Sequence, residues 1–103
     1  MYPVEQQLDK IKTWDHKDLV GLVEYVIALW WMADWGVGWT RRKVKDKWVQ
    51  DAYYYKLTLS TGGWSGNEDI IDALRQNNMF WSFCYYKHRV GGHFTFRIPV
   101  NLK

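Results

Sequence analysis

Residues 79–100 have the sequence MFWSFCYYKHRVGGHFTFRIPV, and this stretch decides the fold. It contains two runs that alternate in the manner of strands, with Gly91 and Gly92 between them. A Gly-Gly pair suits the positive backbone dihedrals of a two-residue turn, so we predict an antiparallel hairpin with a fixed register. The expected facing pairs are Val90 with His93, His88 with Thr95, and Tyr86 with Arg97.

Alternation assigns each side chain of this hairpin to one of two faces. One face is mainly aromatic and aliphatic, which is typical of a core, and the other is polar and basic. The predicted core face holds Trp81, Phe83, Tyr85, Phe94, Phe96, Ile98 and Val100, with Lys87 and Arg89 at its end. The predicted outer face holds Ser82, Cys84, Tyr86, His88, His93, Thr95 and Arg97.

Two earlier runs extend the sheet. KVKDKWVQ (43–50) and YYYKLTLS (53–60) also alternate, and a short polar turn around Asp51 joins them. The same rule divides the second run between the two faces. Tyr53, Tyr55, Leu57 and Leu59 are expected to point inward, and Tyr54, Lys56 and Thr58 outward.

Helical spacing marks three further segments. Apolar residues recur every three or four positions over 4–11, and residues 19–33, which Asp15 can cap, are apolar nearly all round. Residues 67–77 follow a Ser65–Glu68 capping box and end at a predicted left-handed cap formed by Asn77-Asn78. We therefore predict one α+β domain over residues 1–103. It has two N-terminal helices, a four-stranded antiparallel sheet, one helix between strands 2 and 3, and all helices on one sheet face.

The open sheet face is the predicted binding surface. Aromatic and basic side chains on an uncovered antiparallel sheet can hold bases and phosphates. Tyr54 and Tyr86 are predicted to stack, and Lys56, His88, His93 and Arg97 to meet negative charge. A solvated face, or one covered by a second copy of the chain, is the alternative.

The glycine-rich loop STGGWSG (60–66) lies between a predicted strand and helix, the order that phosphate-binding loops use. Glu68 puts negative charge where a phosphate would lie, and no Gly-Lys-Ser/Thr follows, so this is no Walker loop. Trp64 remains a candidate stacking residue, with packing against the helix as its alternative.

The net charge of +3 is concentrated in RRKVKDK (41–47). Such a patch can attract nucleic acid, anionic lipid or an acidic protein, whereas many short charge runs are simply solvated. The predicted basic patch consists of Arg41, Arg42, Lys43, Lys45 and Lys47.

The second helix carries several tryptophans. Trp31 and Trp35 are four residues apart and would share one face, with Trp30 about a quarter turn away. We predict a homo-oligomer, in its simplest form a two-fold dimer, with Trp30, Trp31 and Trp35 at the interface. A membrane span is disfavoured because Glu24 and Asp34 interrupt or end the apolar stretch.

The sequence favours a binding protein over an enzyme. His88 and His93 have no third ligand at zinc spacing, and Cys84 is too far from His88 for a nucleophile and its base. No metal and no cofactor are expected. A single cysteine and the absence of signal-peptide blocks in the first ten residues favour the cytoplasm.

The C-terminal part of the chain, residues 61–103, contains a set of glycine, aromatic and polar residues at defined positions: Gly62, Gly63, Trp64, Ser65, Gly66, Glu68, Phe80, Trp81, Gly91, Gly92 and His93. This set resembles a pattern in short, uncharacterised proteins encoded by bacteriophages and prophages. The resemblance implies a phage or prophage origin, and hence the host cytoplasm, but no known activity. The leading prediction is a non-catalytic phage accessory protein that binds a nucleotide or nucleic-acid-like anion to counter a host defence. A protein–protein inhibitor, acting on a host defence protein, or a homo-oligomeric structural protein is the alternative.

Overall fold

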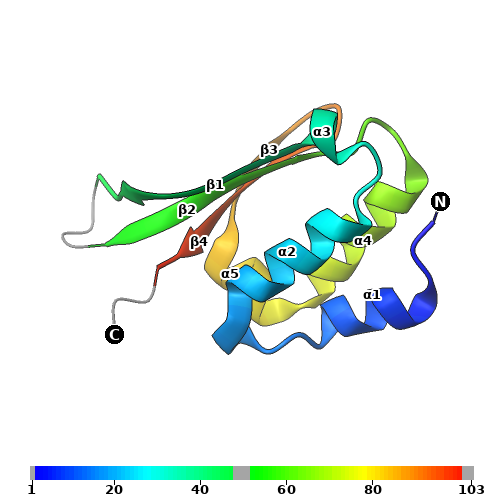
Figure 1. Cartoon of the computed structure of the whole chain (residues 1–103), viewed down its shortest axis with the longest axis horizontal. Helices are drawn as coiled ribbons and strands as arrows, with labels where there is room; N and C mark the ends of the chain where they lie inside the picture. Colours follow the sequence, from blue (N-terminus) through cyan, green and yellow to red (C-terminus); the bar gives the residue numbers. More distant parts are fainter. Residues whose placement is uncertain (1, 48–51, 101–103) are drawn as a thin grey trace.

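The computed structural model describes residues 2–47 and 52–100, and it confirms the predicted α+β class (Figure 1). A four-stranded antiparallel sheet in the order β1-β2-β4-β3 lies over a layer of helices. The predicted turn around Asp51 lies outside the described residues. The elements are α1 (Glu5–Lys12), a 3-10 turn η1 (His16–Asp18), α2 (Leu19–Leu29), α3 (Ala33–Gly36), β1 (Val37–Lys45), β2 (Tyr53–Ser60), α4 (Ser65–Gln76), α5 (Asn78–Cys84), β3 (Tyr85–Arg89) and β4 (His93–Pro99).

The core lies between the sheet and the helices. Side chains that pair directly across antiparallel strands share a face, so the register defines the inner rows. One inner row runs Trp39, Leu57, Phe96 and Tyr85, and the next runs Val37, Leu59, Phe94 and His88. From the helices, Ile11, Leu22, Val23, Val26, Ile70, Ile71, Ala73 and Leu74 are buried against these rows.

The second helix is shorter than predicted. It ends at Leu29 rather than Ala33, because Trp30 is extended and Met32 has a left-handed backbone with φ 59°. Asp15 caps the 3-10 turn by accepting from the Lys17 amide, and Asp18 caps α2. The first strand begins at Val37, well before the predicted start at residue 43, so residues 37–42 join the sheet.

The Ser65–Glu68 capping box is not formed. Trp64 is the N-cap residue of α4 and offers no side-chain hydrogen bond, and Ser65 is already helical. The loop is held instead by Asn67, whose buried amide donates to the Thr61 carbonyl oxygen at 3.3 Å. The same amide bonds both backbone polar groups of Trp31, at 2.9 and 3.1 Å. The α2–α3 connection is thereby fixed to α4.

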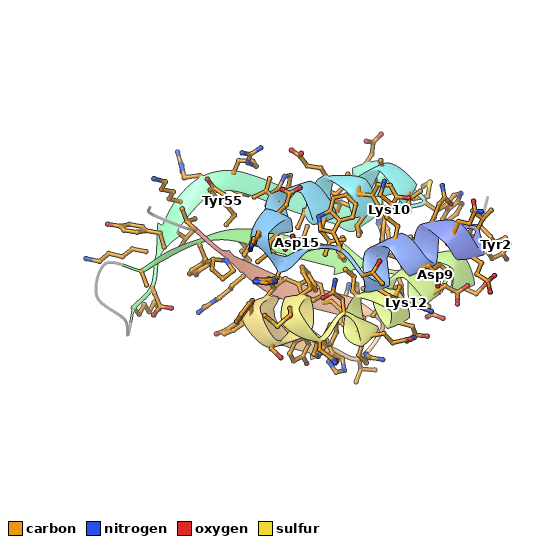
Figure 2. All side chains as sticks on the ribbon, turned by 90° about the horizontal axis from the view of Figure 1, so that it is seen from below. Tyr2, Asp9, Lys10, Lys12, Asp15 and Tyr55 are labelled. Carbon is orange, nitrogen blue, oxygen red and sulfur yellow. The ribbon has the colours of Figure 1, made fainter. Side chains whose placement is uncertain are left out.

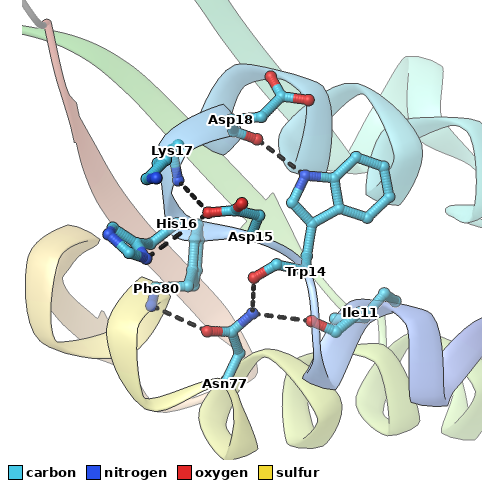
Figure 3. Close-up of polar contacts among 8 residues, drawn as sticks. All are labelled: Ile11, Trp14, Asp15, His16, Lys17, Asp18, Asn77 and Phe80. Atoms are coloured by element: carbon cyan, nitrogen blue, oxygen red, sulfur yellow. Dashed lines mark hydrogen bonds and ion pairs between the residues drawn. The ribbon is translucent and has the colours of Figure 1, made fainter.

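Asn77 does not adopt the predicted left-handed cap; its φ of −83° and ψ of 93° are extended. Its side chain caps α5 by accepting from the Phe80 amide at 3.1 Å. The same side chain donates to the carbonyl oxygens of Ile11 at 2.9 Å and Trp14 at 3.3 Å (Figure 3). Asn77 therefore ties the end of α1 to the α4–α5 junction.

The predicted strand over 79–90 is wrong in its first half. Residues 78–84 form the helix α5, because Phe80 and Cys84 are four residues apart and both are buried on one helical face. Cys84, predicted outward, is therefore inside, and Phe83, predicted inward, is 50% exposed. Burial raises the pKa of the Cys84 thiol to about 12.

The hairpin turn has three residues instead of two. Arg89 pairs with His93, so Val90, Gly91 and Gly92 form the loop, and both glycines have positive φ. A further irregularity between Tyr85 and Lys87 shifts the pairing again. The one-residue shift exchanges the faces predicted for residues 87–89. Lys87 and Arg89 pair with outward Thr95 and His93, whereas His88 pairs with inward Phe94.

No helix within the described ranges has the length and apolar character that crossing a membrane requires.

Candidate functional site on the open sheet face

The open face of the sheet lies opposite the helices, and in Figure 1 no described helix covers it. Three rows of paired residues cross its centre. The first row is Thr40, Lys56 and Arg97; the second is Gly38, Thr58, Thr95 and Lys87; the third is Ser60, His93 and Arg89.

Charge is distributed unevenly between the sheet and the rest of the chain. The four strands carry eight of the fourteen Lys and Arg residues and none of the eleven Asp and Glu residues. The helical layer, seen in Figure 2, carries both signs, for example Asp9, Lys10, Lys12 and Asp15. The cations of the strands are Arg41, Arg42, Lys43, Lys45, Lys56, Lys87, Arg89 and Arg97.

Arg97 is the centre of the site. Its guanidinium carbon lies 4.5 Å from the ring centroid of Tyr54 and 3.7 Å from that of Tyr86. These tyrosines come from β2 and β3, which flank β4, so the guanidinium is held between two rings. The Lys87 ammonium lies 5.6 Å from the Tyr86 ring. Cation–π contacts of this kind are worth roughly 0.5 to 2 kcal/mol each.

The ring contacts leave the hydrogen-bond donors of Arg97 available. A guanidinium has five N–H donors, and a cation–π contact is not a hydrogen bond and uses none of them. Within residues 2–47 and 52–100, Arg97 forms no hydrogen bond or ion pair. The same part of the chain offers no carboxylate within 4.0 Å of Lys56, Lys87 or Arg89. Two of these four cations, Arg97 and Lys87, lie against tyrosine rings, and within the described residues none of the four pairs with a carboxylate.

An acid does lie at one end of the site. Asp46 lines a small pocket of about 230 Å³ together with Tyr54, Tyr86, Arg97 and Pro99. Its backbone amide donates to the Ala52 carbonyl oxygen at 2.8 Å. An anion on the open face would therefore be favoured on the side of Arg97 that faces Lys87 and Arg89.

The two predicted histidines lie on different faces. His93 is on the open face, where its Nδ1 lies 2.8 Å from the Ser60 hydroxyl. His88 is on the helical side, stacked on Phe94 with centroids 5.0 Å apart and with Nδ1 2.8 Å from the Tyr85 hydroxyl. Among the described residues no carboxylate orients His93, so its contact with Ser60 lacks the third member of a catalytic triad.

Trp64 is not part of the open face. Its ring stacks with Tyr2 at 4.9 Å and with Trp31 at 5.1 Å, at the end of the molecule where β2 enters α4. A Cβ at Gly66 would lie 2.5 Å from the Trp64 ring, so the glycine is needed for this packing. The glycine-rich loop connects β2 to α4, and the hydrogen bond from Asn67 to the Thr61 carbonyl oxygen holds it in place.

The basic patch is divided rather than continuous. Arg41 turns to the helical side, where it pairs with Glu24 at 3.2 Å and lies 5.6 Å from the Tyr55 ring. Arg42 and Lys43 fall in a register irregularity of β1, and Lys45 and Lys47 follow it; all four are exposed. Since β1 is an edge strand, these cations also guard against pairing with another sheet.

The three tryptophans predicted at an interface differ in exposure. Trp30 is buried, with its indole nitrogen donating to the Ser60 carbonyl oxygen at 3.3 Å, so it cannot meet a partner. Trp31 is 46% exposed and Trp35 61% exposed. The shared helical face predicted for Trp31 and Trp35 is wrong, because α2 ends before both.

Lys87 and Arg89 were missed as site residues by the sequence prediction. A signal was present, because the two-residue turn placed both cations on the core face, where unpaired charges are rarely buried. A three-residue loop removes that conflict.

No protein-family model, curated protein or solved structure matches this chain. Among the described residues, His, Cys, Asp and Glu side chains form no group of three that could hold a metal ion.

Proposed function

We propose that the open sheet face binds the phosphate groups of a nucleotide or nucleic acid, without catalysing a reaction. The observation that carries this proposal is the set of four cations, Lys56, Arg97, Lys87 and Arg89, on a face without acids in its strands. Tyrosine rings order Arg97, and a preorganised guanidinium suits the two-point geometry of phosphate.

An equilibrium binding titration tests the proposal. Labelled DNA and RNA oligonucleotides, and ATP, are added to the protein at about 50 mM and about 200 mM salt. We expect binding at low salt that weakens as salt rises, because neutralised phosphates release counterions. If neither a nucleotide nor a nucleic acid binds at low salt, the proposal is wrong.

A second candidate function rests on the aromatic end of the molecule. Tyr2, Trp31, Met32 and Trp35 are each between 46% and 61% exposed, and such grouped exposure marks contact surfaces in many proteins. The proposed occupant is a second copy of this chain. Light scattering checks it: a species near twice 12.4 kDa that Trp35→Lys converts to the monomer supports it, and a monomer at high concentration rejects it.

The phage origin, and the role against a host defence that depends on it, stay predictions.

A further inference from the structure

The cations of the open face form a path and not a cluster. Lys56 and Arg97 pair directly across β2 and β4, which places their Cβ atoms about 5 Å apart. Lys87 pairs with Thr95, two residues from Arg97, so this diagonal step is about 7 Å. Arg89 follows two residues later on β3, about another 7 Å.

A path of cations at steps of about 5 to 7 Å suits a chain of phosphates better than the phosphates of one nucleotide. Small molecules bind in concave sites that bury most of their surface. The pocket beside this path, at about 230 Å³, is small and carries the carboxylate of Asp46. Beyond it the face is an open sheet, which offers contact along its surface and little enclosure.

Resting on the proposed function, we infer that the ligand is a single strand of DNA or RNA. It follows the path from Lys56 through Arg97 and Lys87 to Arg89. A duplex has two backbones, whereas this path is one cation wide and is bordered by the neutral residues Thr58 and Thr95. Tyr86 lies beside the path and is 47% exposed, so an unstacked base, which a single strand supplies, can reach its ring.

The test measures the affinity of oligonucleotides of increasing length at several salt concentrations. Fluorescence anisotropy is measured for labelled oligo-dT and oligo-rU of increasing length, and for AMP, ATP and a DNA hairpin duplex as competitors. Four phosphate contacts predict affinity that rises up to about five nucleotides and then levels. They also predict a slope of about −2.8 for the logarithm of the association constant against the logarithm of salt concentration.

Variants separate charge from geometry. Lys87→Gln removes one phosphate contact and should reduce the slope by about 0.7. Arg97→Lys keeps the charge and therefore the slope, but loses the planar fork and weakens binding. Tyr86→Leu should weaken binding about ten-fold at an unchanged slope, because it removes a ring that can stack on a base and that holds Arg97, while every charge remains. Arg75→Gln, on the helical side, is the matched control and should change neither quantity.

Each remaining outcome overturns a defined part of the inference. If ATP binds as tightly as the longer oligonucleotides, the ligand is a nucleotide, and only the proposed function survives. If the duplex binds as tightly as the single strand, the strand preference is wrong. If Arg75→Gln changes the slope as much as Lys87→Gln, the path is wrong. If no anion binds at all, the proposed function fails together with the inference.

Discussion

Arginine side chains on the two sides of the sheet have different partners. On the helical side, Arg41 lies 3.2 Å from the Glu24 carboxylate, and Arg75 lies 3.3 Å from Asp72. Each of these guanidiniums also rests on an aromatic ring. On the open side, Arg97 rests on two rings and has no carboxylate partner among the described residues. Rings position the cation in both places, and within the part of the chain that the structure describes an acid pairs with it only on the helical side.

This difference bears on function because exposed ion pairs contribute little to stability, typically about 0 to 1 kcal/mol. Folding alone therefore does not require the four strands to lack acids. An uncompensated cationic surface lowers the free energy of a bound anion instead. The comparison separates residues that hold the fold from residues that are available to a ligand.

The largest expected effect tests the inner face. Phe96 is fully buried between Phe80, 5.3 Å away, and Trp81, 5.6 Å away, measured between ring centroids. Phe96→Ala should lower the free energy of unfolding by roughly 3 to 5 kcal/mol, because it leaves a cavity. Thr95→Ala, one residue away on the open face, should change it by less than about 0.5 kcal/mol. Urea denaturation measures both, and similar losses would mean that the faces are assigned wrongly.

The next effect tests the helical layer. Asn77→Ala removes the cap of α5 and leaves the carbonyl oxygens of Ile11 and Trp14 without that donor. We expect a loss of roughly 2 to 4 kcal/mol in unfolding free energy. Asn78→Ala, at an exposed neighbouring position, is the control. If the two variants have equal stability in thermal or urea unfolding, Asn77 does not stabilise the helical layer as described.

A smaller effect, on binding and not on folding, tests the open face. Arg97→Ala should reduce oligonucleotide affinity by about 1.5 to 3 kcal/mol, the range for a charged hydrogen bond. Its unfolding free energy should change little, since its contacts are two rings at the surface. Arg75→Ala should leave affinity unchanged. If Arg97→Ala greatly lowers the free energy of unfolding but leaves the oligonucleotide affinity of the folded protein unchanged, Arg97 stabilises the fold and does not bind the ligand.

The smallest effect concerns pH and the inner face. Burial holds the pKa of Cys84 at about 12, above its ordinary value of 9.0, so the folded protein keeps a thiol proton that the unfolded chain loses. The unfolded state then binds fewer protons, and stability must fall as pH rises from about 9 to 12. Between pH 8 and 10 the wild type should lose about 1.4 kcal/mol more than Cys84→Ala. If the unfolding free energies of the wild type and of Cys84→Ala change equally with pH, the Cys84 thiol is accessible to solvent and its pKa is not raised by burial.

The sequence predicted the sheet and its faces best where alternation was regular. Phe94, Phe96 and Ile98 point inward, while Tyr54, Lys56 and Arg97 lie on the open face, as the two-residue period requires. Element boundaries were harder. A run such as MFWSFC suits a strand by composition, and only the buried Phe80 and Cys84, four residues apart, mark it as helical.

The site could be predicted only in part because register depends on one loop residue. Counting Val90 in the loop moves His88 inward and brings Lys87 and Arg89 to the open face. The Gly91-Gly92 pair does not distinguish the two loops, since both contain it, and the only signal for the longer loop is that the shorter one would place Lys87 and Arg89 on the core face. Likewise, the stacking of Trp64 on Tyr2 joins residues far apart in the chain, which periodicity cannot reveal.

The central claim is that phosphates bind the cations Lys56, Lys87, Arg89 and Arg97 of the open face. Nuclear magnetic resonance of the labelled protein, titrated with a five-nucleotide single strand, tests this claim most directly. We predict that the Nε–H signal of Arg97 and the backbone amide signals of Tyr86, Lys87 and Thr95 shift together, while the amide signals of α1 and α4 keep their chemical shifts. Shifts confined to the helical layer, or an Arg97 Nε–H signal unchanged at saturation, would contradict the account.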